Sequence, residues 1–257
     1  PKEEIQKLDA DINKGRAEQL DVLATDDFRK SEKYLNEVKK DLQDNDDQED
    51  ILESIAYGRG SLETAQEKSV SRRAKWDGVL KIRERALNAG ARSDRHRNDL
   101  DNIDDDLRDD IDDEVSTSDY DSLQSRYLNL ELESLHTTHL GKARSMIEGA
   151  REDHRASKDA PKTLKQAELD LTNAKNMIAA NRSNPAGYKE AVDKSNASAQ
   201  MLVDVLAAAH SSRKTIDEDA AIKIVQQNRH LASMQSSLES ANREASQREN
   251  ALKAQGS

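Results

Sequence analysis

The feature that most constrains this chain is the regular spacing of its apolar residues, which recur at steps of three and four over long stretches. Phe28, Leu35, Val38 and Leu42 show the pattern in one short segment. Such spacing places apolar side chains on one stripe of an α-helix and is typical of helices that pack along their length. The chain contains only three prolines to interrupt the pattern. The sequence therefore predicts an all-α protein.

The apolar material is sufficient for thin helical packing but not for a thick globular core. Hydrophobic residues make up 34% of the chain and charged residues 35%, and there is one Phe and one Trp. Disordered chains have a similar composition, but the scarcity of proline and the helical spacing argue against disorder. A rod of packed helices needs only one apolar stripe per helix. We therefore expect an elongated antiparallel helical bundle, or coiled-coil rod.

Two very long helices are expected within this rod. The first begins near Asp50 and runs for about 63 residues, or ~95 Å at ~1.5 Å per residue. The second begins at Pro185 and continues to about residue 250. Four glycines are the candidate kinks in the first helix, each costing roughly 1 kcal/mol relative to alanine: Gly58, Gly60, Gly78 and Gly90. Polar cap signals predict the starts of other helices: Thr25-Asp26-Asp27, Ser116-Thr117-Ser118-Asp119 and Asp159-Ala160-Pro161.

One apolar pattern occurs twice without a gap: Phe28-x6-Leu35-x2-Val38-x3-Leu42 and Leu164-x6-Leu171-x2-Ala174-x3-Ile178. A polar loop and a long helix follow both copies. Chance similarity between two amphipathic helices is the alternative explanation. We interpret the match as two related helical-hairpin repeats, residues 1–115 and residues 116–257, which form one continuous rod.

The last helix carries an unbroken apolar stripe that would face water unless it docks: Ile224, Leu231, Met234, Leu238 and Ala241. We expect residues 216–245 to lie antiparallel on the N-terminal hairpin, because burying each large side chain contributes about 1.5–3 kcal/mol. The residues opposite would be Ile5, Leu8, Ile12, Phe28, Leu35 and Val38. In the alternative, the residues beyond 212 form a projecting linker.

The run from Asp99 to Glu114 holds ten acids and one base, which raises the question of a calcium site. A calcium-binding EF-hand loop requires a glycine at its sixth position and alternating ligands, and this run has neither. Leu100, Ile103 and Leu107 instead keep helical spacing. We therefore interpret the acids as the solvated face of a helix.

A basic stretch lies just before the acidic run and is the one candidate interaction face. As a site, it could bind an anionic polymer or an acidic partner surface. As structure, it would pair with acidic faces of neighbouring helices, and we favour this interpretation. Its nine members are Arg72, Arg73, Lys75, Lys81, Arg83, Arg85, Arg92, Arg95 and Arg97.

Known catalytic and metal-binding patterns are absent from the sequence. Glu133, His136 and His139 have part of the spacing of a di-iron site, but a second Glu-x-x-His motif is missing. His139 lies on an apolar stripe, where a hydrogen-bonded core histidine is the simpler interpretation. There is no cysteine, no phosphate-binding glycine loop and no Gly-x-Ser-x-Gly turn. We expect no catalytic residue, no cofactor and no metal, and hence no enzyme.

Charge and hydropathy limit the partners. The net charge of −11 makes a nucleic-acid backbone an unfavourable partner. No apolar run reaches the ~18 residues that a membrane span requires. The expected partner is therefore a protein whose identity the sequence does not reveal.

The segment from Asp159 to Ala174 carries the pattern AP-x-x-L-x-x-A-x-x-x-L-x-x-A. It resembles a helical domain of Gram-negative envelope proteins, often lipoproteins, in which these helices precede an OmpA-like peptidoglycan-binding domain. The Ala-rich stretch 191–209 and the polar tail to Ser257 are similar to the lead into that domain. The resemblance implies a periplasmic, outer-membrane-associated protein. It also implies that peptidoglycan is bound only through the C-terminal domain missing here, so no binding residue transfers.

Two functions remain open from the sequence. The first is a non-enzymatic structural spacer, scaffold or protein-interaction module of the bacterial cell envelope. The alternative is a cytoplasmic coiled-coil adaptor or effector that binds a protein partner through its basic face. A signal peptide with a lipobox upstream, together with an OmpA-like domain downstream, would select the first.

Overall fold

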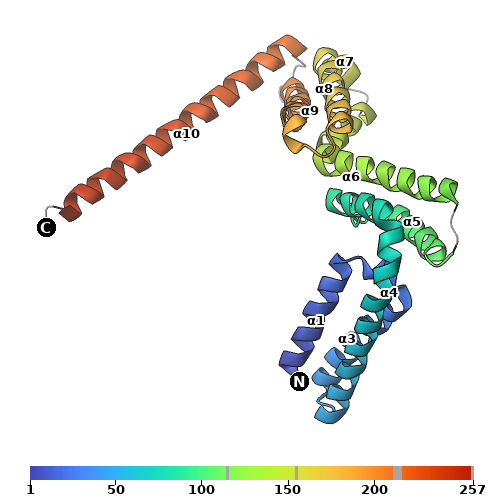
Figure 1. Ribbon diagram of the computed structural model, residues 1–257. Helices are drawn as coiled ribbons and strands as arrows, with labels where there is room; N and C mark the ends of the chain where they lie inside the picture. Colours follow the sequence, from blue (N-terminus) through green and yellow to red (C-terminus); the bar gives the residue numbers. More distant parts are fainter. Residues whose placement is uncertain (114–115, 154–155, 211–215, 256–257) are drawn as a thin grey trace. The chain divides into compact units, whose positions relative to one another are not determined.

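The computed structural model describes residues 1–113, 116–153, 156–210 and 216–255, with side chains up to residue 248. Along these residues the chain forms ten α-helices, one short 3-10 helix and no strand (Figure 1), which confirms the all-α prediction. Contacts divide the chain into two compact units, Pro1–Ser134 (unit 1) and Leu135–Ser257 (unit 2). The division lies within α6 (Thr117–Glu152), whereas we placed the boundary between the repeats at residue 116.

The N-terminal half of unit 1 is a small helical bundle. It comprises α1 (Lys2–Ala17), α2 (Leu20–Leu23), α3 (Thr25–Asp44) and the first half of α4 (Gln48–Ala89). A tight turn reverses the chain between α3 and α4, and the Asp47 carboxylate caps α4 by accepting from the backbone N–H of Glu49 at 2.8 Å. The buried apolar side chains of this half form one core: Ile5, Leu8, Ile12, Leu20, Ala24, Phe28, Leu35, Val38, Ile51, Ile55, Leu62 and Ala65.

This core contradicts the expected docking of residues 216–245. All six N-terminal residues that we placed opposite the last helix are buried within unit 1, where α4 contributes Ile51, Ile55 and Leu62 to the same core. Leu231 and Leu238 are each 62% exposed. The expectation was wrong because the apolar stripe on the first half of α4 covers the N-terminal helices.

The expected helix of about 63 residues is also wrong, because α4 ends at Ala89. Gly90 has φ 108°, a left-handed conformation that favours glycine. Its N–H donates to the carbonyl of Leu87, and the N–H of Ala91 donates to the carbonyl of Ala86, each at 3.1 Å. These two bonds form a Schellman motif, which ends the helix and satisfies its last carbonyls. Of the four candidate kinks, only this glycine interrupts the helix.

The chain then reverses, and the second half of α4 packs against α5 (Arg97–Asp110) and the start of α6. Trp76 is fully buried, stacks on Tyr120 at 5.6 Å between ring centroids, and donates to the carbonyl of Ile111 at 3.3 Å. Ser116 caps α6 as the sequence predicts, because its hydroxyl accepts from the backbone N–H of Asp119 at 3.2 Å. Unit 1 therefore holds two cores along the single helix α4.

Unit 2 contains the remainder of α6, then α7 (Ala156–Asp159), α8 (Pro161–Ala180), a 3-10 turn (Pro185–Gly187), α9 (Lys189–His210) and α10 (Glu218–Gln255). Its core is rich in alanine. The buried residues that form it are Ala143, Ile147, Ala150, Ala156, Ala160, Ala167, Ala199, Leu202, Val205, Ala209, Ala221 and Val225.

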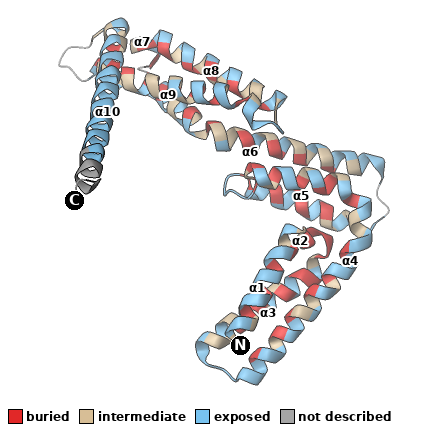
Figure 2. Cartoon of the chain, turned by 60° about the vertical axis from the view of Figure 1, so that its left-hand side comes forward, coloured by how far each residue is buried: buried red, intermediate tan, exposed pale blue. Residues whose placement is uncertain are grey.

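The last long helix was expected to be continuous, and this is wrong. A new helix begins at Glu218, where the Asp217 carboxylate accepts from the N–H of Ala220 at 2.8 Å as an N-terminal cap. Beyond Val225, α10 is exposed along its described length (Figure 2).

The two copies of the sequence repeat have the same local structure. In each, a four-residue helix is followed by one alanine and then by a helix of 20 residues. The two linking alanines have nearly equal backbone angles, φ −148° and ψ 56° at Ala24 and φ −145° and ψ 48° at Ala160. Both are buried. Thr25 and Pro161 are therefore the first helical residues, and neither Thr25 nor Asp159 acts as the cap that we expected. This agreement favours two related repeats over chance similarity.

The helix end at Gly90 can be tested against a second glycine of α4. Gly90→Ala should destabilise the protein by about 1–2 kcal/mol, because an alanine is strained at this positive φ. Gly60→Ala is the control and should stabilise it by about 0.5–1 kcal/mol, because Gly60 is exposed and an added methyl group would meet no atom within 4 Å. Urea unfolding followed by circular dichroism gives both values. Equal effects of the two substitutions would contradict the assigned helix end.

Candidate functional site

The nine basic residues from Arg72 to Arg97 do not form one free cationic face. Seven of them bind a carboxylate or a carbonyl oxygen of unit 1: Arg72, Arg73, Lys75, Lys81, Arg83, Arg85 and Arg97. Arg92 and Arg95 are exposed in the turn after α4, and no ion pair is seen for either within the described residues. Five of the nine therefore join different segments of unit 1: Arg72, Arg73, Lys75, Arg83 and Arg85. Lys81 and Arg97 form exposed local pairs, and Arg92 and Arg95 are exposed in the turn.

Arg83 lies at the centre of the stretch and is only 1% exposed. Its Nε and Nη2 donate to the two carboxylate oxygens of Asp104 at 2.8 and 2.7 Å, a bidentate pair. Nη2 also donates to Asp21 at 2.7 Å, and Nη1 donates to Gln19 Oε1 at 3.2 Å. The Tyr127 hydroxyl donates to Asp104 at 2.7 Å. The guanidinium group of Arg83 thus connects α4 with α5 and with the segment around α2, and the Asp104 carboxylate connects this group to α6.

The electrostatics keep these groups in one protonation state. Burial alone would lower the pKa of Arg83, but the hydrogen bonds and negative charge of Asp104 outweigh it and raise the pKa above its usual value. Burial and the charge of Asp104 also raise the pKa of Tyr127, so the phenol remains protonated and donates. Because neither Arg83 nor Tyr127 gains or loses a proton near neutral pH, the cluster is suited to joining helices rather than to transferring protons.

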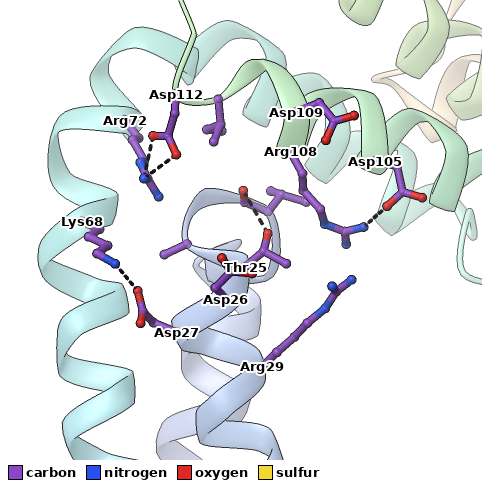
Figure 3. A pocket seen from close by; sticks show the side chains of 13 residues that line it. Thr25, Asp26, Asp27, Arg29, Lys68, Arg72, Asp105, Arg108, Asp109 and Asp112 are labelled. Carbon is purple, nitrogen blue, oxygen red and sulfur yellow. Dashed lines mark hydrogen bonds and ion pairs between the residues drawn. The ribbon is translucent and has the colours of Figure 1, made fainter.

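A polar groove of about 490 Å³ lies beside this cluster, between the start of α3, α4 and α5 (Figure 3). Its cations are largely paired across the groove: Lys68 with Asp27, and Arg72 with Asp112 at 2.6 Å. The hydrogen bond from Lys68 lowers the pKa of Asp27, which therefore remains ionised. Asp26, Arg29 and Asp109 are exposed lining residues (Figure 3).

The chemistry available in the groove is limited to charge pairing. Its lining contains Asp, Arg and Lys side chains, one threonine and three apolar residues. The hydroxyl of Thr25 donates to the carbonyl of Asp21 at 2.9 Å. Nucleophilic catalysis requires a nucleophile within hydrogen-bond reach of a base, and this lining brings no such pair together.

The acidic run forms α5 and the turn after it, up to Asp113, and Glu114 lies outside the described residues. Leu100, Ile103 and Leu107 are buried, which confirms the helical spacing. The interpretation of every acid as solvated is wrong for Asp104, which is 3% exposed and binds Arg83. Its position four residues after Leu100 was the signal for burial, because residues four apart lie on the same helix face.

The histidines of α6 have separate partners. His136 Nε2 lies 3.4 Å from the carbonyl oxygen of Lys175, and His139 Nε2 lies 3.3 Å from the hydroxyl of Tyr188. Glu133 is exposed. Within the part of the chain that is described, no three His, Cys, Asp or Glu side chains are grouped so that they could hold a metal ion.

Unit 2 also has a buried carboxylate that joins helices. Asp170 of α8 is 5% exposed and accepts from the Ser198 hydroxyl at 2.5 Å, from Gln166 at 3.0 Å and from Lys194 at 3.0 Å. Burial by itself would raise the pKa of Asp170, but these donors outweigh it, so the pKa lies below its usual value.

One carboxylate attaches the start of α10 to the rest of unit 2. Glu218 accepts from the backbone N–H of Thr163 at 2.7 Å, from its hydroxyl at 2.8 Å, and from the N–H of Lys162 at 3.2 Å. A carboxylate is favourable there because these N–H groups are the unpaired donors of the first turn of α8.

Comparison with protein-family models, with curated proteins and with solved structures finds no match to this chain. Across the described residues, no helix combines the length and the apolar character needed to span a bilayer. The residues themselves therefore carry any functional argument.

The buried pair in unit 1 can be tested by removing one charge and then both. Arg83→Met should cost about 3–5 kcal/mol, because Asp104 remains charged and buried without its partner. Arg83→Met with Asp104→Asn should recover part of this loss, since position 104 no longer holds a buried charge without a partner and Tyr127 keeps an acceptor. The recovery is partial because Asp21 also loses its bond to Arg83. Lys81→Met is the control and should cost under ~1 kcal/mol, because its pair with Asp77 is exposed. Urea unfolding followed by Trp76 fluorescence measures all three variants. A double variant no more stable than Arg83→Met alone would argue against the coupling.

Acid should weaken unit 2 through Asp170. Because its pKa is lowered in the folded protein, this carboxylate contributes stability above its unfolded pKa of ~3.9, and the contribution is lost as pH falls through the folded pKa. Wild type should therefore be more stable than Asp170→Asn at pH 7, and the difference should shrink below about pH 4. Urea midpoints from circular dichroism at pH 7 and pH 3 provide the comparison. Asp193→Asn, which removes an exposed carboxylate on α9, should show little change at either pH.

Proposed function

We propose that this chain is a non-enzymatic structural spacer or scaffold. The observation that carries the proposal is the use of charge in unit 1, where Arg83 is fully buried and binds Asp104, Asp21 and Gln19 from different helical segments. Breaking a buried pair is costly, so such contacts hold helices in one arrangement. A catalytic acid or base instead needs a proton that it can exchange near the working pH. The raised pKa values of Arg83 and Tyr127 support a structural role.

The proposal extends to the bacterial cell envelope through the resemblance of residues 159–174. In this setting the chain stands between an anchor and a peptidoglycan-binding domain, and peptidoglycan is bound by that other domain. Fractionation of the source organism, with an antibody against this chain, tests the location. Recovery with the periplasm or outer membrane is expected, and recovery in the cytosol would overturn this part of the proposal.

The alternative is a cytoplasmic adaptor that binds an acidic protein surface through its basic face. One observation favours it: Arg92 and Arg95 are exposed together in the turn between α4 and α5. Two exposed arginines attract an acidic partner through charge, and this attraction weakens as salt increases.

A charge reversal in this turn separates the two functions. Arg92→Glu with Arg95→Glu should leave cross-linking to neighbouring proteins in the native host unchanged if the chain is a spacer. Lys165→Glu with Lys223→Glu is the matched control, since it makes the same charge change at two exposed positions of unit 2. If only the arginine variant loses a cross-linked protein, the adaptor function replaces the spacer.

A further inference from the structure

The part of α10 beyond Val225 carries an apolar stripe that unit 2 does not cover. Ala221 and Val225 are buried in the core of unit 2. Farther along the same helix, Leu231 is 62% exposed, Met234 57% and Leu238 62%. A stripe of large apolar side chains on a solvent-exposed helix indicates an interaction surface rather than a solvated one.

The spacing of this stripe is that of a two-stranded coiled coil. Leu231, Met234, Leu238, Ala241 and Ala245 follow one another at steps of three and four residues. This is the alternation of the two inward-facing positions of the heptad repeat, at which each side chain packs between side chains of a facing helix. The occupant that fits the stripe is therefore another helix with the same spacing.

The N-terminal apolar residues of this chain are not available as that helix, because α4 already covers them within unit 1. A second copy of α10 offers the required spacing. The positions that flank the stripe are mainly uncharged, which avoids repulsion between two copies: Asn228, His230, Gln235, Ser237, Asn242 and Glu244.

The order of large and small residues selects the orientation. In a parallel pair in register, Ala241 would face Ala241 of the second copy. One end of the contact would then contain only small side chains. In an antiparallel pair centred near residue 236, Leu231 faces Ala241 of the second copy and Met234 faces Leu238 of the second copy. The combined side-chain volume is then nearly even along the contact, as close packing requires.

The flanking positions agree with the antiparallel order. In that arrangement His230 lies beside Glu244 of the second copy, where the ring can donate a hydrogen bond to the carboxylate, and residues at these positions set orientation in coiled coils. We propose that two copies of this chain associate through an antiparallel coiled coil of α10, formed by residues 227–245. This inference goes beyond the spacer function and does not depend on it.

The absence of cysteine allows a direct test of orientation with a short bis-maleimide cross-linker. A mixture of Leu231→Cys and Ala241→Cys proteins should cross-link to each other, whereas Leu231→Cys alone should not, because its two thiols would be ~15 Å apart along the axis. Ser237→Cys, near the two-fold axis, should cross-link to itself. Ser236→Cys, on the outer face of the helix, controls for random collisions.

Sedimentation equilibrium of the whole chain tests association itself. The average mass should rise with concentration toward that of a dimer, and Leu231→Ser with Leu238→Ser should remain monomeric. Both leucines are exposed, so this variant should keep the circular dichroism and Trp76 fluorescence of the wild type. A wild-type mass that stays monomeric at every concentration would overturn the dimer. Self-cross-linking of Leu231→Cys above the Ser236→Cys level would overturn the antiparallel order.

Discussion

The buried contact between Arg83 and Asp104 constrains the rest of unit 1, because each charge is kept out of water only while the other is in place. The bidentate geometry sets the position of α5 along α4, and the Tyr127 hydroxyl sets that of α6 on the same carboxylate. An apolar core as thin as this one allows neighbouring helices to slide by a turn at modest cost. A buried, directional ion pair does not, since a shift would leave a charge without its partner.

The two repeats reach similar hairpins with different residues at equivalent places. Ala24 and Ala160 occupy the same break between a short helix and a long one, with nearly equal backbone angles. Both alanines are buried. Polar contacts differ between the copies: the first places a buried arginine pair farther along its chain, and the second places Asp170 directly between α8 and α9. The helical scaffold is thus shared, while the polar contacts that lock it are specific to each copy.

Apolar spacing predicted the all-α fold well, because each helix needs one apolar stripe that faces a neighbouring helix. It did not predict where long helices end. Gly58, Gly60 and Gly90 look alike in sequence, but only Gly90 has a positive φ, which depends on the reversal that lets α5 pack on α4. Spacing also could not assign partners to stripes, so the docking of α10 was misplaced. Asp104 was missed because the surrounding acids are exposed and only its position on the helix face distinguishes it.

The composition of the chain accounts for both the buried charge in unit 1 and the exposed stripe of α10. With few large apolar residues, unit 1 divides its core into two parts along α4, and an ion pair holds helices together where apolar area is scarce. Unit 2 fills its core largely with alanine, which lets helices approach closely but buries little area per residue. Leu231, Met234 and Leu238 are nevertheless left on the exposed part of α10. In a chain so short of apolar side chains, this placement favours their use in contact with another helix over a purely solvated role.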